Sequence, residues 1–400
     1  MTIPVRRLTV LLAMLVAVTP LAIDMYLPAM QMMAADLDTP IHYVELSVSG
    51  FLLGFAIGQI TGGSLSDRWG RKPAVALGLS IFALASVALI WTDTLESLLA
   101  LRVIQAIGGG IAVVNSSAVV RDLYSGKDMA RVLSMIAMVM MTAPLLAPML
   151  GAFFATVGGW RVIFAALAGY AVLVGILFLW QVPESRKHEE QSPGMIAAYL
   201  RIIRHRQAMA YVLVLSFAFS GMFAFITAAP FTYLEHYGVG VEIFPFLFGA
   251  NIITMMLFNR VNVRLLSRST PNKLMMTGVG VQCVAGAGLL LASMTDAPLW
   301  IVVVCNMLFV GVLGLIAANA TASCLQFFPD ISASANAVIG VVEFCMGAAV
   351  GLLWAQMHDG SLIPIAWVMF GCALLALLSF VVLGAKQPQQ PESISSASHS

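Results

Sequence analysis

Long apolar stretches alternate with short polar turns along nearly the whole chain. Each stretch has about the length, roughly 20 residues, that a helix needs to cross the hydrocarbon core of a bilayer. The pattern predicts twelve such helices, at about 8–29, 44–65, 73–92, 97–120, 131–157, 161–182, 208–229, 243–263, 273–294, 298–322, 332–356 and 364–384. We therefore expect an all-α membrane protein with twelve transmembrane helices.

The second set of six stretches repeats the first at an offset of about 200 residues. Both sets contain a short turn with the same pair of residues, Thr92-Asp93 in one and Thr295-Asp296 in the other. Such a repeat predicts two pseudo-symmetric six-helix bundles, related by an axis along the membrane normal and sharing a cavity between them.

This division gives four segments. We expect an N-terminal bundle over 1–182, a cytoplasmic linker over 183–207, a C-terminal bundle over 208–385 and a disordered cytoplasmic tail over 386–400. The end of the linker, from Met195 to Arg206, has the amphipathic pattern of a helix that lies on the membrane surface. The tail is rich in Gln, Pro and Ser, which is typical of disorder.

Composition supports a polytopic membrane protein, because 60% of the 400 residues are hydrophobic and only 10% are charged. A soluble domain could not bury so much apolar surface. Of the 20 Lys and Arg residues, all but Arg102 and Arg161 fall in segments that would lie on one side of the membrane. The excess of basic residues on the cytoplasmic side of membrane proteins then predicts that both termini are cytoplasmic.

The sequence carries no sign of metal, cofactor or enzyme chemistry. The five cysteines lie in or beside apolar stretches of the second half without a C-x-x-C pair, and the six histidines fall in loops, at span ends or in the tail. There is no glycine-lysine phosphate loop for ATP and no clustered catalytic constellation. We expect a transporter rather than an enzyme, a channel or a receptor.

The turn at 62–73 reads G-G-S-L-S-D-R-W-G-R-K-P and joins two spans across very few residues. Gly62 and Gly63 allow the helix end to approach a neighbour, Gly70 permits the turn, and Asp67 can face the positive N-terminus of a neighbouring helix. An ordinary basic cytoplasmic loop is the alternative, but it needs neither the glycines nor the aspartate. The residues that we expect to act in gating here are Gly63, Asp67, Arg68, Gly70 and Arg71.

Three ionisable side chains fall inside spans, namely Asp24, Arg102 and Glu343. Each would cost about 2.5 to 3.5 kcal/mol if it faced lipid, so each should point into a bundle or a watery cavity. Burial raises the pKa of a carboxylate toward the working range, which allows it to load and release protons. We expect these three residues to couple transport to proton movement.

Each of the three has an alternative role. Asp24 could be solvated near the outer end of its span, or help to end the helix before Pro28. Glu343 could be a neutral packing carboxyl or could bind a cationic substrate. Arg102 could pair with an acid and steady the spans 8–29 and 97–120.

The 62–73 turn resembles the signature G-x-L-x-D-R-x-G-R-K between the second and third helices of the major facilitator superfamily. Leu101 to Gly110, L-R-V-I-Q-A-I-G-G-G, is similar to the family's helix 4 signature, in which the arginine is associated with proton transfer. Ala143 to Ala152, A-P-L-L-A-P-M-L-G-A, resembles the helix 5 signature of its exporters, with alanine in place of several glycines. The resemblance implies that Pro144, Pro148 and Gly151 bend and thin this helix, so that helices 5 and 8 can meet and part.

Four segments resemble the bicyclomycin and chloramphenicol resistance (Bcr/CflA) branch of drug:proton antiporters. These are I-D-M-Y-L-P-A-M (23–30), the S-D-R-W-G-R-K-P turn, A-V-V-R-D (118–122) and G-W-R (159–161). The resemblance is concentrated in the first half, since the turn at 259–273 keeps the basic charge but lacks the aspartate and the glycines. It implies a bacterial inner-membrane exporter with protons, a small-molecule substrate and the bilayer as partners, no nucleic acid, and a monomeric state.

The span 44–65 carries Gly50, Gly54, Gly58 and Gly62 on one face, since they recur every four residues. The superfamily fold would place the span 332–356 opposite, with its own glycines at 340, 347 and 351, so we expect a sliding surface between the two. Plain packing is the alternative. We also expect Asp67 to face the start of the span 332–356 when the cytoplasmic side is shut, and Arg71 to pair with Asp122.

Polar, aromatic and soft side chains at suitable depth are candidates for the substrate cavity. They are Tyr26, Gln59, Asn115, Met138, Met141, Phe223, Asn251, Asn306 and Asn319. An adaptable lining with few fixed donors suits moderately hydrophobic drugs better than sugars. We expect proton-coupled drug efflux by alternating access, with uptake or efflux of a small metabolite (nucleoside, amino acid or sugar) as the alternative.

Overall fold

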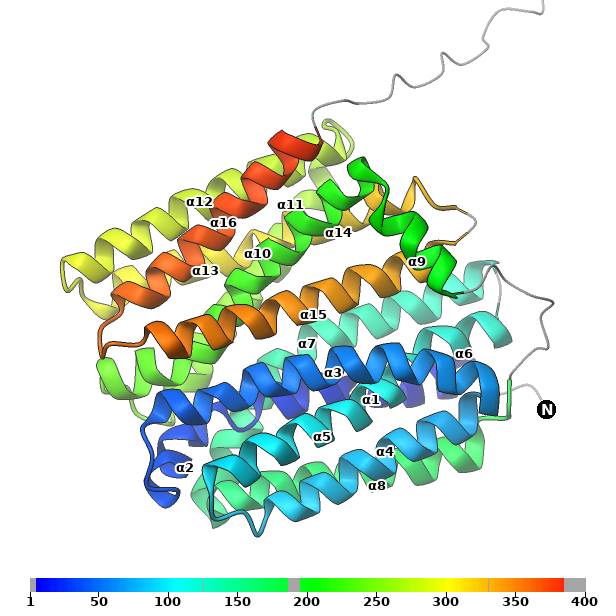
Figure 1. Cartoon of the computed structure of the whole chain (residues 1–400), viewed down its shortest axis with the longest axis horizontal. Coiled ribbons are helices and arrows are strands. Elements are labelled where there is room, and N and C mark those ends of the chain that lie inside the picture. Colours follow the sequence, from blue (N-terminus) through cyan, green and yellow to red (C-terminus); the bar gives the residue numbers. More distant parts are fainter. Residues whose placement is uncertain (1–4, 125, 186–194, 330, 385–400) are drawn as a thin grey trace, which may run out of the picture.

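The computed structural model describes residues 5–124, 126–185, 195–329 and 331–384, and within these ranges the regular structure is helical (Figure 1). Twelve segments are long and apolar enough to cross a membrane, as the hydrophobic pattern predicts. In the first half they are formed by α1 (Val5–Asp24) with α2 (Met30–Asp36), α3 (Ile41–Trp69), α4 (Arg71–Leu89), α5 (Leu95–Val113) with α6 (Asn115–Leu123), α7 (Gly126–Gly158) and α8 (Trp160–Gln181). In the second half they are α10 (Arg206–Pro230) with η2 (Phe231–His236), α11 (Phe244–Leu265), α12 (Pro271–Met294), α13 (Leu299–Gly311) with α14 (Leu313–Leu325), α15 (Ser332–Met357) and α16 (Ile363–Leu383).

Four of the spans are interrupted, which the apolar pattern does not predict. The first span leaves α-helical geometry after Asp24 and passes through a short 3₁₀ turn, η1 (Leu27–Ala29), which contains Pro28. The seventh changes to a π-helical turn at Phe231, immediately after Pro230. Proline lacks the N–H that would continue the helical hydrogen bonds, so both changes have a local cause.

The twelve spans form two six-helix bundles. In the first half α3 and α4 pack on α5, α4 packs on α8, and α1 packs on α7. In the second half α10 packs on α15 and α16, α12 packs on α16, and α11 packs on α13. The bundles meet where α3 lies beside α15 and α7 beside α11, and Figure 1 shows α3 and α15 side by side at the centre of the molecule.

The glycine row of α3 faces α5 within the same bundle, and our expectation of a sliding surface between bundles was wrong. A Cβ atom at Gly54 would overlap the carbonyl of Val103, and one at Gly58 would overlap that of Ile107. The four-residue spacing fixed the common face of the glycines but not the helix that this face meets. The α3–α15 contact is made instead by another face of α3, through residues such as Ser49, which approaches Gly351.

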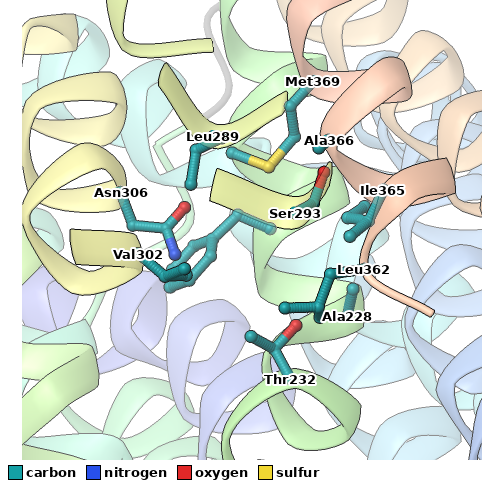
Figure 2. A pocket seen from close by; sticks show the side chains of 11 residues that line it. Ala228, Thr232, Leu289, Ser293, Val302, Asn306, Leu362, Ile365, Ala366 and Met369 are labelled. Atoms are coloured by element: carbon teal, nitrogen blue, oxygen red, sulfur yellow. The ribbon is translucent and has the colours of Figure 1, made fainter. Parts of the chain in front are cut away.

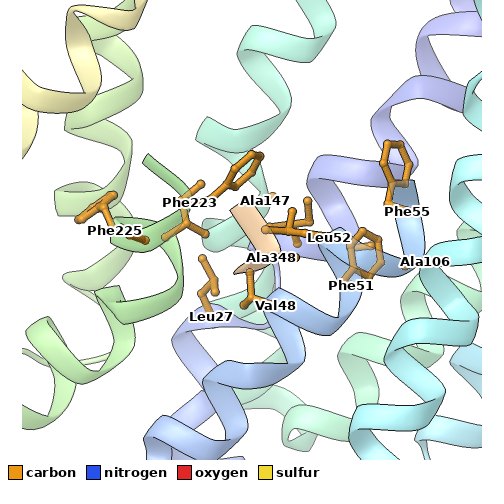
Figure 3. Close-up of a cluster of buried hydrophobic side chains, with 14 of the residues drawn as sticks. Leu27, Val48, Phe51, Leu52, Phe55, Ala106, Ala147, Phe223, Phe225 and Ala348 are labelled. Carbon is orange, nitrogen blue, oxygen red and sulfur yellow. The ribbon is translucent and has the colours of Figure 1, made fainter. Parts of the chain in front are cut away.

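An apolar cluster crosses from one bundle to the other near the middle of the molecule (Figure 3). Leu52 and Phe55 contribute from α3, Phe223 from α10 and Ala348 from α15. The ring of Phe344 on α15 lies 4.8 Å from that of Phe55 and 5.6 Å from that of Phe223. These contacts close the interface between the bundles at this depth.

Parts of the expected linker and tail, residues 186–194 and 385–400, lie outside the described residues. Within the expected amphipathic segment the chain forms the helix α9 (Met195–Ile203). The boundaries that we assigned to the two bundles and the linker remain predictions.

Candidate functional site

A cavity of about 760 Å³ lies between the two halves at the end of the molecule that carries the 62–73 turn, which we call the loop end. The first half contributes Gln59 and Gly63 from α3 and Asn115 from α6, and the second half contributes Ser334 and Gly340 from α15. The lining also includes Ser66, Asp67, Arg71, Val113, Val114, Ser116, Ser117, Ala118, Arg121, Asp122, Tyr199, Asn336, Ala337 and Val341. It is more polar than the adaptable apolar lining that we expected, because the polar faces of α6 and of the first part of α15 both turn toward it.

Arg71 ties the turn to the end of the fourth span. Its guanidinium lies 3.0 Å from a carboxylate oxygen of Asp122 and 2.8 Å from one of Asp67, and it also donates to the Ser66 hydroxyl. The expected pair of Arg71 and Asp122 is therefore present. Within the described residues Asp67 forms no ion pair with the start of α15; its side chain is 67% exposed at the cavity.

The carboxylate of Glu184 holds the start of α4, a role that our sequence analysis missed. Its two oxygens accept the backbone N–H groups of Arg71 and Lys72 at 2.9 and 3.0 Å. The N-terminus of a helix carries unpaired N–H groups and a partial positive charge, so a carboxylate is the suitable partner. We expected such a contact from Asp67 at α15, whereas the structure shows one from Glu184 at α4.

The three glycines of the 62–73 segment have different environments. Gly70 has φ +104°, and a Cβ atom there would lie 2.7 Å from a carboxylate oxygen of Glu184. Glycine is therefore required at position 70 for two reasons, the positive φ angle of the backbone and the lack of space for a Cβ atom. Gly63 has no atom within 4 Å of such a Cβ, so it faces the cavity and makes no close helix contact. The expected close approach holds for Gly62, which meets Ile111.

Arg102 is completely buried inside the first bundle. It donates a hydrogen bond to the carbonyl oxygen of Ala22 at 2.9 Å and another to the side chain of Gln105, and its guanidinium carbon lies 4.3 Å from the centre of the Tyr26 ring. No carboxylate lies within ion-pair distance of it among the described residues. Arg102 thus joins α5 to the end of α1 through a backbone carbonyl, and the expected alternative of an acid partner does not apply in this conformation.

Asp24 is the last residue of α1 and is only 3% exposed. Its Oδ1 atom has no hydrogen-bond partner within the described residues. The alternative of a solvated residue near the outer end is therefore wrong, although the helix does end at Asp24. Glu343 is half-buried on α15, between Gly340 at the cavity and the ring of Phe344.

The nine predicted cavity residues divide into several groups. Gln59 and Asn115 line the cavity between the halves. Tyr26 is buried against Arg102 and shares a hydrogen bond with the hydroxyl of Ser47, and Phe223 belongs to the apolar cluster. Met138 is 65% exposed and is not among the residues lining the described cavities.

The predicted asparagines lie mostly inside the second bundle. Asn319 donates to the side chain of Asn262 at 2.7 Å, which links α14 to α11. Asn306 donates to the Tyr233 hydroxyl at 3.3 Å and lines a narrow, largely apolar pocket within this bundle (Figure 2). The Oδ1 atoms of Asn306 and Asn251 have no partner among the described residues. These three asparagines do not line the cavity between the halves.

Helix α7 contains both Pro144 and Pro148 and meets α11, as expected for helices 5 and 8. Gly249 of α11 approaches the side chain of Leu145. Gly151, however, thins α7 toward the first span, because a Cβ atom there would overlap the carbonyl oxygen of Met25.

A second carboxylate that our sequence analysis missed, Glu45, lies at the end of the molecule opposite the loop end. It is completely buried near the start of α3. It accepts the N–H of Phe231 at 2.9 Å and the indole N–H of Trp354 at 3.0 Å, both from the second bundle. The apolar pattern gave little signal for it, since a glutamate close to the end of a span is ordinarily solvated.

Comparison with known proteins gives a consistent picture. Residues 12–352 match the family model of the Major Facilitator Superfamily. The chain is 32% identical over 379 residues to a bicyclomycin resistance protein homolog of Haemophilus influenzae, covering 94% of this chain and 95% of the relative. It is 31% identical over 388 residues to a chloramphenicol resistance protein of Pseudomonas aeruginosa, covering 91% and 86%.

Among solved structures, the fold is similar to that of the xylose transporter XylE from E. coli in a partially occluded inward open conformation. The TM-score is 0.74 at 17% identity, and the superposition covers 94% of this chain and 97% of the other. At this identity the likeness concerns the fold alone.

Proposed function

The chain belongs to the major facilitator superfamily, and from this premise we propose that it exports small, moderately hydrophobic drugs in exchange for protons. The family and its relatives make it a multi-pass transport protein rather than an enzyme. The names of two relatives, which refer to bicyclomycin and chloramphenicol resistance, support this class of substrate. We propose compounds of these two kinds as the first to test.

The observation that carries proton coupling is the buried carboxylate of Asp24, which has an oxygen without a partner. A carboxylate in such surroundings is costly to keep charged, so it gains a proton more readily than a solvated one. Arg102 is bonded to the carbonyl of Ala22, two residues from Asp24, and it supplies a fixed positive charge in the same region. We propose that Asp24 is the principal proton carrier and that Arg102 positions the end of α1.

Glu343 is a second candidate for this role. It lies one turn from Gly340, which lines the cavity, and it is less deeply buried than Asp24. We propose that Glu343 contributes to the binding of substrate or of a second proton.

Alternating access of the two bundles would carry the substrate across. The cavity at the loop end and the buried Glu45 contacts at the opposite end are consistent with a state open on one side. Because the basic residues gather at the loop end, we propose that this end faces the cytoplasm, that both termini are cytoplasmic, and that the protein lies in the bacterial inner membrane as a monomer.

Transport of a small metabolite is the second candidate, and the polar lining of the cavity favours it. Gln59, Asn115 and Asn336 provide amide groups that could bind a hydroxylated or charged solute. A drug exporter would transport chloramphenicol-like compounds without competition from sugars, nucleosides or amino acids. A metabolite carrier would transport one of these metabolites without competition from chloramphenicol-like compounds.

The test is reconstitution into liposomes with an imposed pH gradient, with uptake of labelled chloramphenicol as the readout. We expect wild-type protein to accumulate the drug against its gradient and Asp24→Asn to lose this accumulation. Asp296→Asn is a matched control, because Asp296 is exposed and has φ +44°, a conformation that asparagine tolerates. Drug movement that ignores the pH gradient in all three proteins would rule out the proposed coupling.

A further inference from the structure

One carboxylate of the first bundle receives both of its hydrogen bonds from the second. The Oε1 atom of Glu45 accepts the backbone N–H of Phe231, and its Oε2 atom accepts the indole N–H of Trp354. The two donors belong to different spans, since Phe231 begins η2 and Trp354 lies on α15. Glu45 thus joins α3 to two elements of the other half at once.

The contact is tightly enclosed. Glu45 and Trp354 are completely buried and Phe231 is 2% exposed. The rings of Phe231 and Trp354 lie 5.8 Å apart, beside the carboxylate. Because both partners of Glu45 are N–H donors, both oxygens must act as acceptors, which is the arrangement that an ionised carboxylate requires.

Phe231 donates to Glu45 at the point where the seventh span changes from α-helical to π-helical geometry, after Pro230. Such changes alter the backbone hydrogen-bond pattern and are frequent at functional sites. The position of this donor is therefore set by the irregular turn itself.

Two imidazoles cover the contact, one from each half. His42 precedes Glu45 by one turn on α3, and His358 follows Trp354 by one turn after α15. Their ring centres lie 4.4 Å apart, and the ring of His358 also lies 4.5 Å from that of Phe231. The Nδ1 atom of His358 is buried without a partner among the described residues.

The other charged and titratable groups around this contact come from the neighbouring segments. They are Glu235 and His236 on η2, Asp359 after His358, and Asp38 before α3. No Lys or Arg forms an ion pair with Glu45 among the described residues. When Glu45 is ionised, two N–H groups stabilise its charge, and no Lys or Arg does so among the described residues.

We propose that Glu45 is a second proton-binding site, which locks the two bundles together on the outer side when ionised and releases them when protonated. A proton from outer water binds one carboxylate oxygen of Glu45. The resulting O–H group then faces an N–H donor, and two donors cannot form a hydrogen bond with each other. One of the two hydrogen bonds between the bundles is thereby lost, and the remaining acceptor is weaker because it is neutral. The proton returns to outer water when the bundles close again, so the step balances without net transfer across the membrane.

The paired histidines act in the same direction. Protonation of both His42 and His358 would place two positive charges on opposite bundles at close range, which opposes closure. Acid on the outer side would thus favour the outward-open state, in which a proton-driven exporter releases its substrate. The link to substrate release rests on the proposed function. The pH-dependent contact at Glu45 does not depend on which substrate is moved.

The experiment measures the distance between spin labels attached at positions 31 and 356 on the outer ends of the two halves, both exposed, after the five native cysteines have been replaced by serine. Purified protein without substrate is followed from about pH 8 to about pH 5. We expect the long-distance population of wild type to grow as the pH falls. Glu45→Gln should show this population already at pH 8 and lose most of its pH dependence.

Three further variants separate the possible explanations. Trp354→Phe keeps a ring but removes the indole donor. The long-distance population of this variant should therefore grow at a higher pH than that of wild type. Glu242→Gln removes an exposed carboxylate at the same end and should behave as wild type. A Glu45→Gln protein with the wild-type pH profile would overturn the proposal, as would a pH response that disappears only when His42 and His358 are replaced by asparagine.

This readout is independent of drug export. If wild type fails to move chloramphenicol but its outer distance still responds to pH through Glu45, the proposed function fails and the lock stands. If drug export follows the pH gradient while Glu45→Gln changes neither distance nor export, the lock fails and the proposed function stands.

Discussion

Arg71 at the start of α4 and Asp122 near the end of α6 form an ion pair of 3.0 Å. The pair connects the second and third spans to the fourth at the mouth of the cavity, and both side chains are largely buried. The hydroxyl of Ser185 donates to the same carboxylate oxygen at 3.1 Å, so the chain leaving α8 joins the same cluster.

Asp122→Asn should reduce the rate of transport severalfold, because it removes the charge that holds Arg71 while keeping the shape of the side chain. The folded protein should lose on the order of 1 kcal/mol, because the two side chains, 17% and 15% exposed, still reach water that screens their charges. Initial rates in proteoliposomes, measured at equal amounts of folded protein, check this expectation. Asp128→Asn, in the exposed first turn of helix α7, is the control, and equal losses in both variants would contradict a specific role for the pair.

Glu184→Gln should weaken the start of α4, because a neutral amide is a poorer partner for the N–H groups of Arg71 and Lys72. The expected loss is about 0.3–1 kcal/mol, typical of an exposed charge at a helix N-terminus. Thermal unfolding in detergent gives the measurement. A midpoint equal to that of wild type, or to that of the control Glu242→Gln, would show that this contact contributes nothing to stability.

Gly70→Ala should destabilise the protein much more than Gly63→Ala. At Gly70 an added Cβ meets the Glu184 carboxylate and the backbone has φ +104°, whereas at Gly63 it meets open space. Conformational strain of this kind costs roughly 1–3 kcal/mol. Gly63 lies in the last turns of α3 and Gly70 follows that helix directly, so the two variants add the same methyl group at the same end of the protein. Similar midpoints for both would contradict the explanation.

Gly54→Ala should impair folding of the first bundle rather than slow the movement between bundles, because the added Cβ would overlap the backbone of α5. The yield of monodisperse protein and its unfolding temperature should both fall. Gly280→Ala in α12 is the matched control, since no atom lies within 4 Å of its added Cβ. A stable Gly54→Ala protein with slow transport would restore the sliding surface that we rejected.

The contact between Glu45, Phe231 and Trp354, which His42 and His358 cover, should lose stability in acid. Burial, followed by the neighbouring His42, lowers the pKa of His358, while Asp359 opposes this shift. The folded state with the closed contact therefore favours neutral His358, so its contribution is complete above the ordinary histidine pKa, about 6.5, and is lost as the pH falls through the lowered value. His358→Asn should show a smaller decrease in unfolding temperature on acidification than wild type. An identical decrease in wild type and in His358→Asn would exclude His358 as a cause of the loss of stability in acid.

Much of the architecture followed from the sequence. The length of the apolar stretches and their repeat predicted the twelve spans and the two bundles, because the bilayer imposes one length and one chemistry on every span. The pair of Arg71 and Asp122 could also be predicted from the sequence, since charges in short turns have few partners within reach.

The partners across the molecule were decided by tertiary structure. The spacing of the α3 glycines placed them on one face, but only packing chose α5 rather than α15 as the helix they meet. Glu184 and Glu45 each bind N–H groups far away in the sequence, and no local pattern marks these donors as available. Periodicity is a property of neighbouring residues, whereas the choice of contacting faces depends on how all twelve helices fill the same volume.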